Sequence, residues 1–296
     1  MNRGAARPGS AGLLARPGGA LTLLFVWPFL LYVCAFLILP TLMLLATAFR
    51  GGHGATWHYV GELGQTQTLI AFRNSIELSA VSALAGLVIG GLAAYFVLRP
   101  GMPGGLRSLV TTFSAVAANF AGVPLAFAFI ATLGSLGVIT VWLKSIGVDL
   151  YATGFRLYSI SGLVIVYAYF QVPLMIIVIT PALQALRSEW REAAENLGAS
   201  SADYWRHVGL PILLPSLLSA YILLFGNAFS AYATPYAISS GIVALVPVEI
   251  SNVLSGNVML SRQTGAALAF GMIIVMVVVM ALYALISRRV ARWSRR

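Results

Sequence analysis

The sequence predicts an all-α, polytopic membrane protein with six transmembrane helices and both termini in the cytoplasm. Hydrophobic residues make up 59% of its 296 residues and charged residues only 9%, which is too few polar side chains to cover a soluble domain. The apolar residues also form continuous runs of about 20 or more, the length of a spanning helix, and not the alternating strands of a membrane barrel. These observations exclude a soluble enzyme, a disordered chain and a disulfide-rich secreted domain.

The six apolar runs set the expected domain organisation. A poorly ordered cytoplasmic tail, 1–19, precedes a first helix and outer loop in 20–68. A core domain of five helices follows in 69–287, and a basic cytoplasmic tail, 288–296, ends the chain. The expected spans are about 20–48, 69–98, 109–133, 159–186, 212–232 and 264–287.

The basic residues give the orientation. The chain carries 18 Lys and Arg against 8 Asp and Glu, a net charge of +10. With both ends in the cytoplasm, 13 of the 18 fall in segments on the cytoplasmic side, as the positive-inside rule requires. In so apolar a chain this charge indicates contact with anionic lipid and not with nucleic acid.

Small residues and prolines mark special positions in the spans. Ala83, Gly86, Gly90, Gly91 and Ala94 form a small-residue face on the second span, which we interpret as helix packing within the bundle. Proline also occurs in or near the spans, where it can kink or break a helix, at Pro40, Pro124 and Pro173.

Glu77 is the one acid well inside an apolar run. Asn74-Ser75-Ile76-Glu77 is similar to a capping box, with Asn74 as the cap and Glu77 three residues later. We therefore favour a helix-capping role for Glu77, and a role as a ligand for a solute or an ion is the alternative.

No catalytic motif is present. The chain has no H-E-x-x-H pair, no G-x-S-x-G turn and no Walker A loop, and one cysteine cannot build a zinc site. We therefore expect no enzyme activity, catalytic residue or metal site. A carrier or channel that works alone is the alternative to a transporter subunit, and an intramembrane enzyme is a third reading.

The longest polar connection, residues 187–211, holds four of the eight acids. Its first half favours a helix that Gly198 would end. Ser200 or Ser201 would then cap a second short helix, and Leu210-Pro211 would end that helix and begin the fifth span. We call residues 187–211 the elbow. Its apolar knobs indicate a docking surface for a partner, and an amphipathic loop lying on lipid is the alternative. These knobs are Trp190, Leu197, Tyr204 and Trp205.

The elbow also carries a spaced motif. Glu192-Ala193-Ala194 is followed by Gly198 after three residues and by Val208-Gly209-Leu210-Pro211 after nine more. This spacing resembles the EAA loop of the membrane subunits of binding-protein-dependent ABC importers with the type I fold. That loop usually has Ile where this chain has Val208. The resemblance covers about 70–290, with Asn74-Ser75 opening the first core helix.

The resemblance implies a permease subunit in a bacterial inner membrane. Its elbow would dock on a separate ATPase, so that ATP hydrolysis there drives solute uptake. The implied partners are two ATPase subunits, a second permease subunit, a periplasmic or lipid-anchored substrate-binding protein, and membrane lipid. The second permease subunit could be like or unlike this chain, and we expect a different chain. ATP and Mg would bind to the ATPase, and this chain would bind no cofactor. The implied coupling residues are Glu192, Ala193, Ala194, Leu197, Gly198, Tyr204, Trp205, Val208, Leu210 and Pro211.

The solute class follows from a weaker resemblance. The polar, aromatic segment 227–236 and the single helix before the core are similar to permeases for spermidine and putrescine, which implies polyamine transport. Aromatic rings suit the passage of a cation. The residues expected to line the pathway are Asn119, Tyr167, Tyr169, Gln171, Asn227 and Tyr232. The alternative role for each is helix–helix hydrogen bonding or a place in an interfacial aromatic belt.

Overall fold

The computed structural model describes residues 18–51, 54–99, 101–255 and 258–293. Within these ranges, helices dominate, and the only strands are β1 (Arg50–Gly51) and β2 (Gly54–Ala55), which pair antiparallel. Six helical segments are long and apolar enough to cross a membrane, at 26–48, 66–97, 123–145, 160–184, 201–230 and 262–288. The predicted all-α class with six candidate spans is confirmed. The predicted N-terminal tail lies outside the described residues as far as residue 17.

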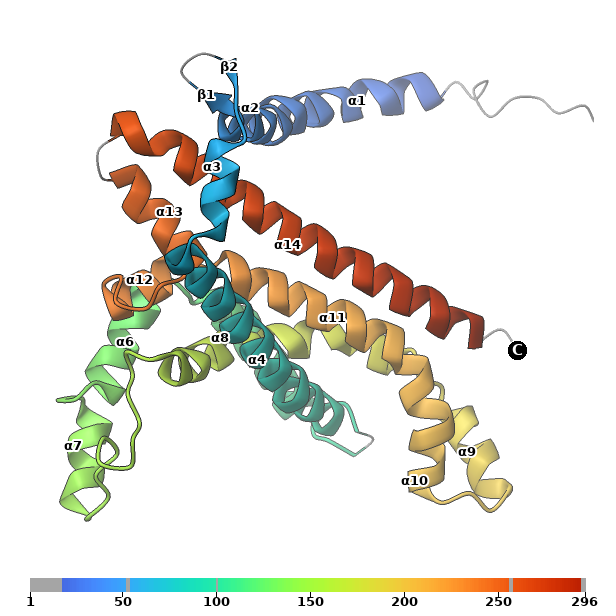
Figure 1. Cartoon of the computed structure of the whole chain (residues 1–296). Helices are drawn as coiled ribbons and strands as arrows, with labels where there is room; N and C mark the ends of the chain where they lie inside the picture. The colour runs from blue at the N-terminus through green and yellow to red at the C-terminus, as the bar shows by residue number, and fades with distance from the viewer. Residues whose placement is uncertain (1–17, 52–53, 100, 256–257, 294–296) are drawn as a thin grey trace, which may run out of the picture.

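The helices follow one another along the whole chain (Figure 1). Their bounds are α1 (Gly18–Val33), α2 (Leu39–Ala48), α3 (His58–Gly61), α4 (Thr66–Val97), α5 (Gly104–Asn119), α6 (Val123–Leu133), α7 (Val138–Ser145), α8 (Ile160–Gln184), α9 (Ser188–Asn196), α10 (Ser201–Tyr204), α11 (Leu210–Ser230), α12 (Ala233–Ser239), α13 (Val246–Ser255) and α14 (Val258–Trp293). Because α14 continues to Trp293, the predicted basic tail is helical up to that residue.

Two π turns interrupt otherwise continuous helices. Residues 34–38 join α1 to α2, and residues 205–209 join α10 to α11. Each turn ends two residues before a proline, Pro40 or Pro211. Proline lacks the N–H that would continue the regular ladder, and a π turn moves the hydrogen bonds to donors one residue further on.

The core lies where α4, α8 and α11 pack against one another, and α5 lies along α8. A Cβ added at Gly86 would lie 2.8 Å from the Cβ of Gln171 in α8, and one at Gly90 would lie 2.6 Å from the carbonyl oxygen of Val172. Ala83 and Ala94 are buried on the same face. The predicted small-residue face therefore packs within the bundle. Gly91 differs, because a Cβ there would meet only the Met175 side chain, at 3.6 Å.

The predicted third span, 109–133, is wrong as a single helix. The chain breaks at residues 120–122, where Gly122 has a φ of 78°, and α5 and α6 lie on either side. The N–H of Gly122 donates to Oγ1 of Thr234 at 2.8 Å, which fixes the break beside α12. From there α6 and α7 leave the bundle (Figure 1). Pro124 sits in the first turn of α6, where proline is tolerated.

The capping interpretation of Glu77 is also wrong. α4 begins at Thr66, so Asn74 and Glu77 lie in the helix interior. The Asn74 side chain instead donates to the carbonyl oxygen of Ala244 at 3.1 Å. Oγ of Ser75 accepts from the N–H of Val246 at 2.9 Å. These two residues therefore anchor the start of α13 and do not open a helix, and Glu77 is exposed on α4.

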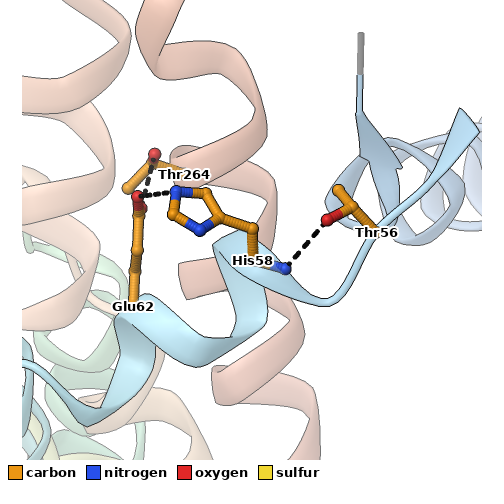
Figure 2. Close-up of polar contacts among 4 residues, drawn as sticks. All are labelled: Thr56, His58, Glu62 and Thr264. Carbon is orange, nitrogen blue, oxygen red and sulfur yellow. Dashed lines mark hydrogen bonds and ion pairs between the residues drawn. The ribbon is translucent and has the colours of Figure 1, made fainter. Parts of the chain in front are cut away.

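The first helix stands apart from the core. α1 extends away from the bundle, and α2 contacts α14 (Figure 1). Figure 2 shows how the following connection is fixed: Oε2 of Glu62 accepts from the Thr264 hydroxyl of α14 at 3.0 Å, and Oε1 lies 3.5 Å from Nε2 of His58. The connection is therefore tied to α14 by a polar contact across 202 residues of sequence.

Candidate functional site

The elbow consists of two helices joined by a well-defined turn. Gly198 follows α9 with a φ of 79°, in the left-handed region that favours glycine. The N–H of Ala199 donates to the carbonyl oxygen of Ala194 at 3.0 Å, and that of Gly198 donates to Glu195 at 2.9 Å. This pair of bonds is the Schellman motif, which satisfies the last carbonyls of α9. The predicted role of Gly198 at the helix end is confirmed.

The second helix of the elbow starts with a capping box. Oγ of Ser200 accepts from the N–H of Asp203 at 3.2 Å, and Oδ2 of Asp203 accepts from the N–H of Ser200 at 3.1 Å. Of the two candidates, Ser200 is therefore the cap. The expected end of this helix at Leu210-Pro211 is wrong, because α10, the π turn and α11 form one continuous segment from Ser201 to Ser230.

Arg191 joins the two arms of the elbow through a hydrogen bond, and an ion pair within α9 holds its side chain in place. Nε of Arg191 lies 2.9 Å from Oε1 of Glu195, one turn further along α9. Nη2 of Arg191 also donates to Oγ of Ser201 in α10 at 3.4 Å. The hydrogen bond from the Glu195 carboxylate raises the pKa of Arg191 above its usual range. The arms are thus held both by the turn and by this side chain.

The apolar residues of the elbow fall into two groups. Leu197, at the tip, is 88% exposed, and Trp190 is also exposed. Tyr204 is only 5% exposed, and the Trp205 ring meets Tyr95 of α4 edge-on at 5.0 Å between centroids. The prediction of four apolar knobs is therefore wrong for Tyr204, which is buried, and for Trp205, which attaches the elbow to α4.

The remaining motif residues lie on both sides of the tip. Glu192 and Ala193 are exposed on α9, and Ala194 is half-buried. Val208 lies in the π turn, and Leu210 and Pro211 begin α11. Sequence reasoning missed Tyr95, because a contact with a residue 110 positions away leaves no local signal.

The candidate pathway residues differ in how far their side chains are buried. Tyr167 and Gln171 are fully buried, and Nε2 of Gln171 donates to the carbonyl oxygen of Leu224 at 2.9 Å. Neither side chain is available to a solute in this structure. Gln171 takes the alternative role of helix–helix hydrogen bonding, and Tyr167 packs in the apolar core.

The other four candidates reach a surface. Asn119 and Asn227 are exposed, and Tyr169 is half-buried. Tyr232 is 37% exposed and stacks on Tyr236 at 5.2 Å between ring centroids. Asn119 lies at the α5–α6 break, and Tyr232 lies just before α12. Hydrogen bonds between Gly122 and Thr234 join the break to α12.

Known proteins share this architecture. A family model described as "Binding-protein-dependent transport system inner membrane component" matches residues 86–292. The sulfate transport system permease protein CysT of Escherichia coli is 26% identical over 215 residues, which cover 72% of this chain and 73% of CysT. The spermidine/putrescine permease protein PotC of Haemophilus influenzae is 23% identical over 268 residues, or 88% of this chain and 95% of PotC.

The fold is similar to that of a solved transporter. A crystal structure of a bacterial ABC transporter involved in alginate import contains a chain that superposes with a TM-score of 0.72 at 21% identity, covering 91% of this chain and 96% of that one. The family match spans well over half of the sequence and includes the whole elbow. The chain therefore belongs to the family of binding-protein-dependent transport system inner membrane components and is the permease subunit of an ATP-binding-cassette importer.

Proposed function

We propose that the elbow is the element through which a separate ATPase subunit drives this permease. The observation that carries the proposal is the division of its apolar residues: Leu197 protrudes at the tip, while Tyr204 is buried and Trp205 holds the base against α4. An exposed leucine on a rigid turn fits a hydrophobic pocket of a partner. Glu192 and Ala193 lie exposed beside it, as a charged and a small contact.

In this proposal the energy comes from outside the chain. ATP and Mg would bind to two ATPase subunits, and this permease would bind no cofactor. A second permease subunit of different sequence would complete the solute pathway, and a periplasmic or lipid-anchored binding protein would deliver the solute. The elbow and both termini would face the cytoplasm of a bacterial inner membrane, the side that the arginines favour.

The test is reconstitution of the chain with an ATPase, a second permease subunit and a substrate-binding protein. Leu197→Ser should lower co-purification of the ATPase, and transport should require ATP hydrolysis. Uptake that runs on an ion gradient without any ATPase would support the carrier or channel alternative and would refute the proposal.

We further propose a small polyamine such as spermidine or putrescine as the solute. The support is the pair of stacked, exposed tyrosines, Tyr232 and Tyr236, whose ring faces attract cations, and the extent of the similarity to PotC. CysT, which is 26% identical, is a sulfate transport system permease protein, so the same reconstituted system should be offered both solutes. Uptake of sulfate but not of spermidine would overturn this assignment and leave the role of the elbow intact.

A further inference from the structure

Beside the elbow lies a cavity of about 290 Å³ whose walls carry four arginines. Arg99 follows the end of α4, Arg107 is in α5, and Arg187 and Arg191 belong to the elbow. None of the described residues that line the cavity is acidic, and Glu195 neutralises only Arg191. The guanidinium of Arg99 is held over the Tyr95 ring, 5.7 Å from its centroid. The cavity is therefore a strongly positive site whose planar donors match phosphate oxygens.

An apolar groove of about 480 Å³ continues from this cavity. The two share three wall residues, Tyr95, Leu183 and Trp205. The groove extends along α4 as far as Leu87, eight residues before Tyr95, which is about 12 Å of helix. Its other walls come from α8 and α11, and every residue that lines it is apolar or aromatic. The arginine cavity thus opens into the apolar groove, which follows α4 toward the middle of the spans.

We propose that the cavity and the groove together hold one anionic phospholipid, with its phosphate among the arginines and an acyl chain along α4. A free oxyanion or an acidic side chain of a partner would use the arginines but would leave the groove empty. A partner helix would fill the groove but would not supply negative charge at its end. A lipid supplies both, and anionic headgroups gather on the face where the arginines lie.

The experiment measures lipid retention on the full-length chain, purified with its partners in mild detergent. Native mass spectrometry counts the phosphatidylglycerol molecules that stay bound, with phosphatidylcholine as the neutral comparison. The double variant Arg99→Gln/Arg107→Gln should lower phosphatidylglycerol retention at least about tenfold, the loss expected for one charge-assisted hydrogen bond or more. Arg288→Gln, at the end of α14, removes a charge outside the cavity and should leave retention unchanged.

A second variant tests the groove without touching the arginines. Gly91→Leu places a side chain in the groove, and a Cβ there meets nothing closer than 3.6 Å, so α4 is expected to remain intact. This variant should also lower phosphatidylglycerol retention.

Several results would overturn the proposal. Equal retention of phosphatidylcholine, or full retention in both variants, would show that the lipid does not use this site. Displacement by millimolar inorganic phosphate with no effect of Gly91→Leu would make the cavity a site for free oxyanions. A cross-link from the Gly91→Cys variant to the second permease subunit would identify a protein in the groove. The proposal is independent of the elbow's role, because loss of ATPase binding alone would not change lipid retention.

Discussion

Gly198→Val is the most direct test of the elbow. Gly198 has a φ of 79°, and a Cβ built there meets no atom within 4 Å. The substitution therefore changes backbone conformation without creating a clash. Valine is among the residues least suited to the left-handed region, because its branched Cβ crowds the neighbouring carbonyl.

The magnitude can be worked out in two ways. If the turn keeps its geometry, valine adds strain of about 1–2 kcal/mol. If the turn changes, the two Schellman hydrogen bonds of Gly198 and Ala199 are lost, at about 0.5–1.5 kcal/mol each. Either route destabilises the elbow by a similar free energy. The equilibrium constant between the elbow and competing turns then changes by about five- to thirtyfold.

The assay measures ATPase activity stimulated by the binding protein, together with recovery of the ATPase on the purified permease. Both should fall in Gly198→Val and remain close to normal in Gly198→Asn, because asparagine tolerates this conformation. Gly147→Val is the matched control: Gly147 has a φ of 90°, also with nothing within 4 Å, but lies in the α7–α8 connection. Normal coupling in Gly198→Val, or an equal loss in Gly147→Val, would refute the reasoning.

Three further predictions concern single contacts. Leu197→Ser should weaken ATPase binding at least about tenfold, since docking would bury an apolar side chain worth about 1.5–3 kcal/mol; a binding titration measures this. Gly90→Leu should lower the free energy of unfolding by about 1–3 kcal/mol or more and reduce the Tm, because its Cβ would lie 2.6 Å from the Val172 oxygen. Thr264→Val should cost about 1 kcal/mol by removing the donor to Glu62, and faster proteolysis of the 50–64 connection should report it.

Each of these predictions has a matched control. Leu136 is 90% exposed near the α6–α7 turn, so Leu136→Ser should leave ATPase binding unchanged. Gly91→Leu should preserve the Tm that Gly90→Leu lowers, because its Cβ has room. The Thr132 hydroxyl bonds to carbonyls of its own helix, so Thr132→Val should not expose the 50–64 connection. An effect of the same size in a control would assign the result to general destabilisation.

The elbow was predictable because local chemistry determines it. A glycine after a run of helix-forming residues ends that helix, and a serine three residues before an aspartate caps the next one. Both signals lie within four residues of the structure that they specify. Apart from the third, the spans were predictable for a similar reason, since length and hydropathy decide which segments can cross a membrane.

The errors come from tertiary contacts that leave no local pattern. Asn74 has the spacing of a helix cap, but its amide donates to Ala244, 170 residues away. The helix break at Gly122 lies inside an apolar run, so the hydropathy of the sequence does not predict it. A hydrogen bond to Thr234 of α12 holds the break in place. Gln171 has the polarity of a pathway residue, and only the packing of α8 against α11 shows that it is buried.

The same packing determines where a force on the elbow would act. From Ser201 to Ser230 the chain is one helical segment about 45 Å long, interrupted only by the π turn. Within that turn Trp205 lies between Tyr95 and Gly209, where an added Cβ would come within 2.8 Å of its ring. A displaced tip must therefore either move α11 and α4 together or separate Trp205 from Tyr95. Because packed contacts shift between discrete arrangements and do not deform continuously, a small motion at Leu197 would be transmitted to two spans at once.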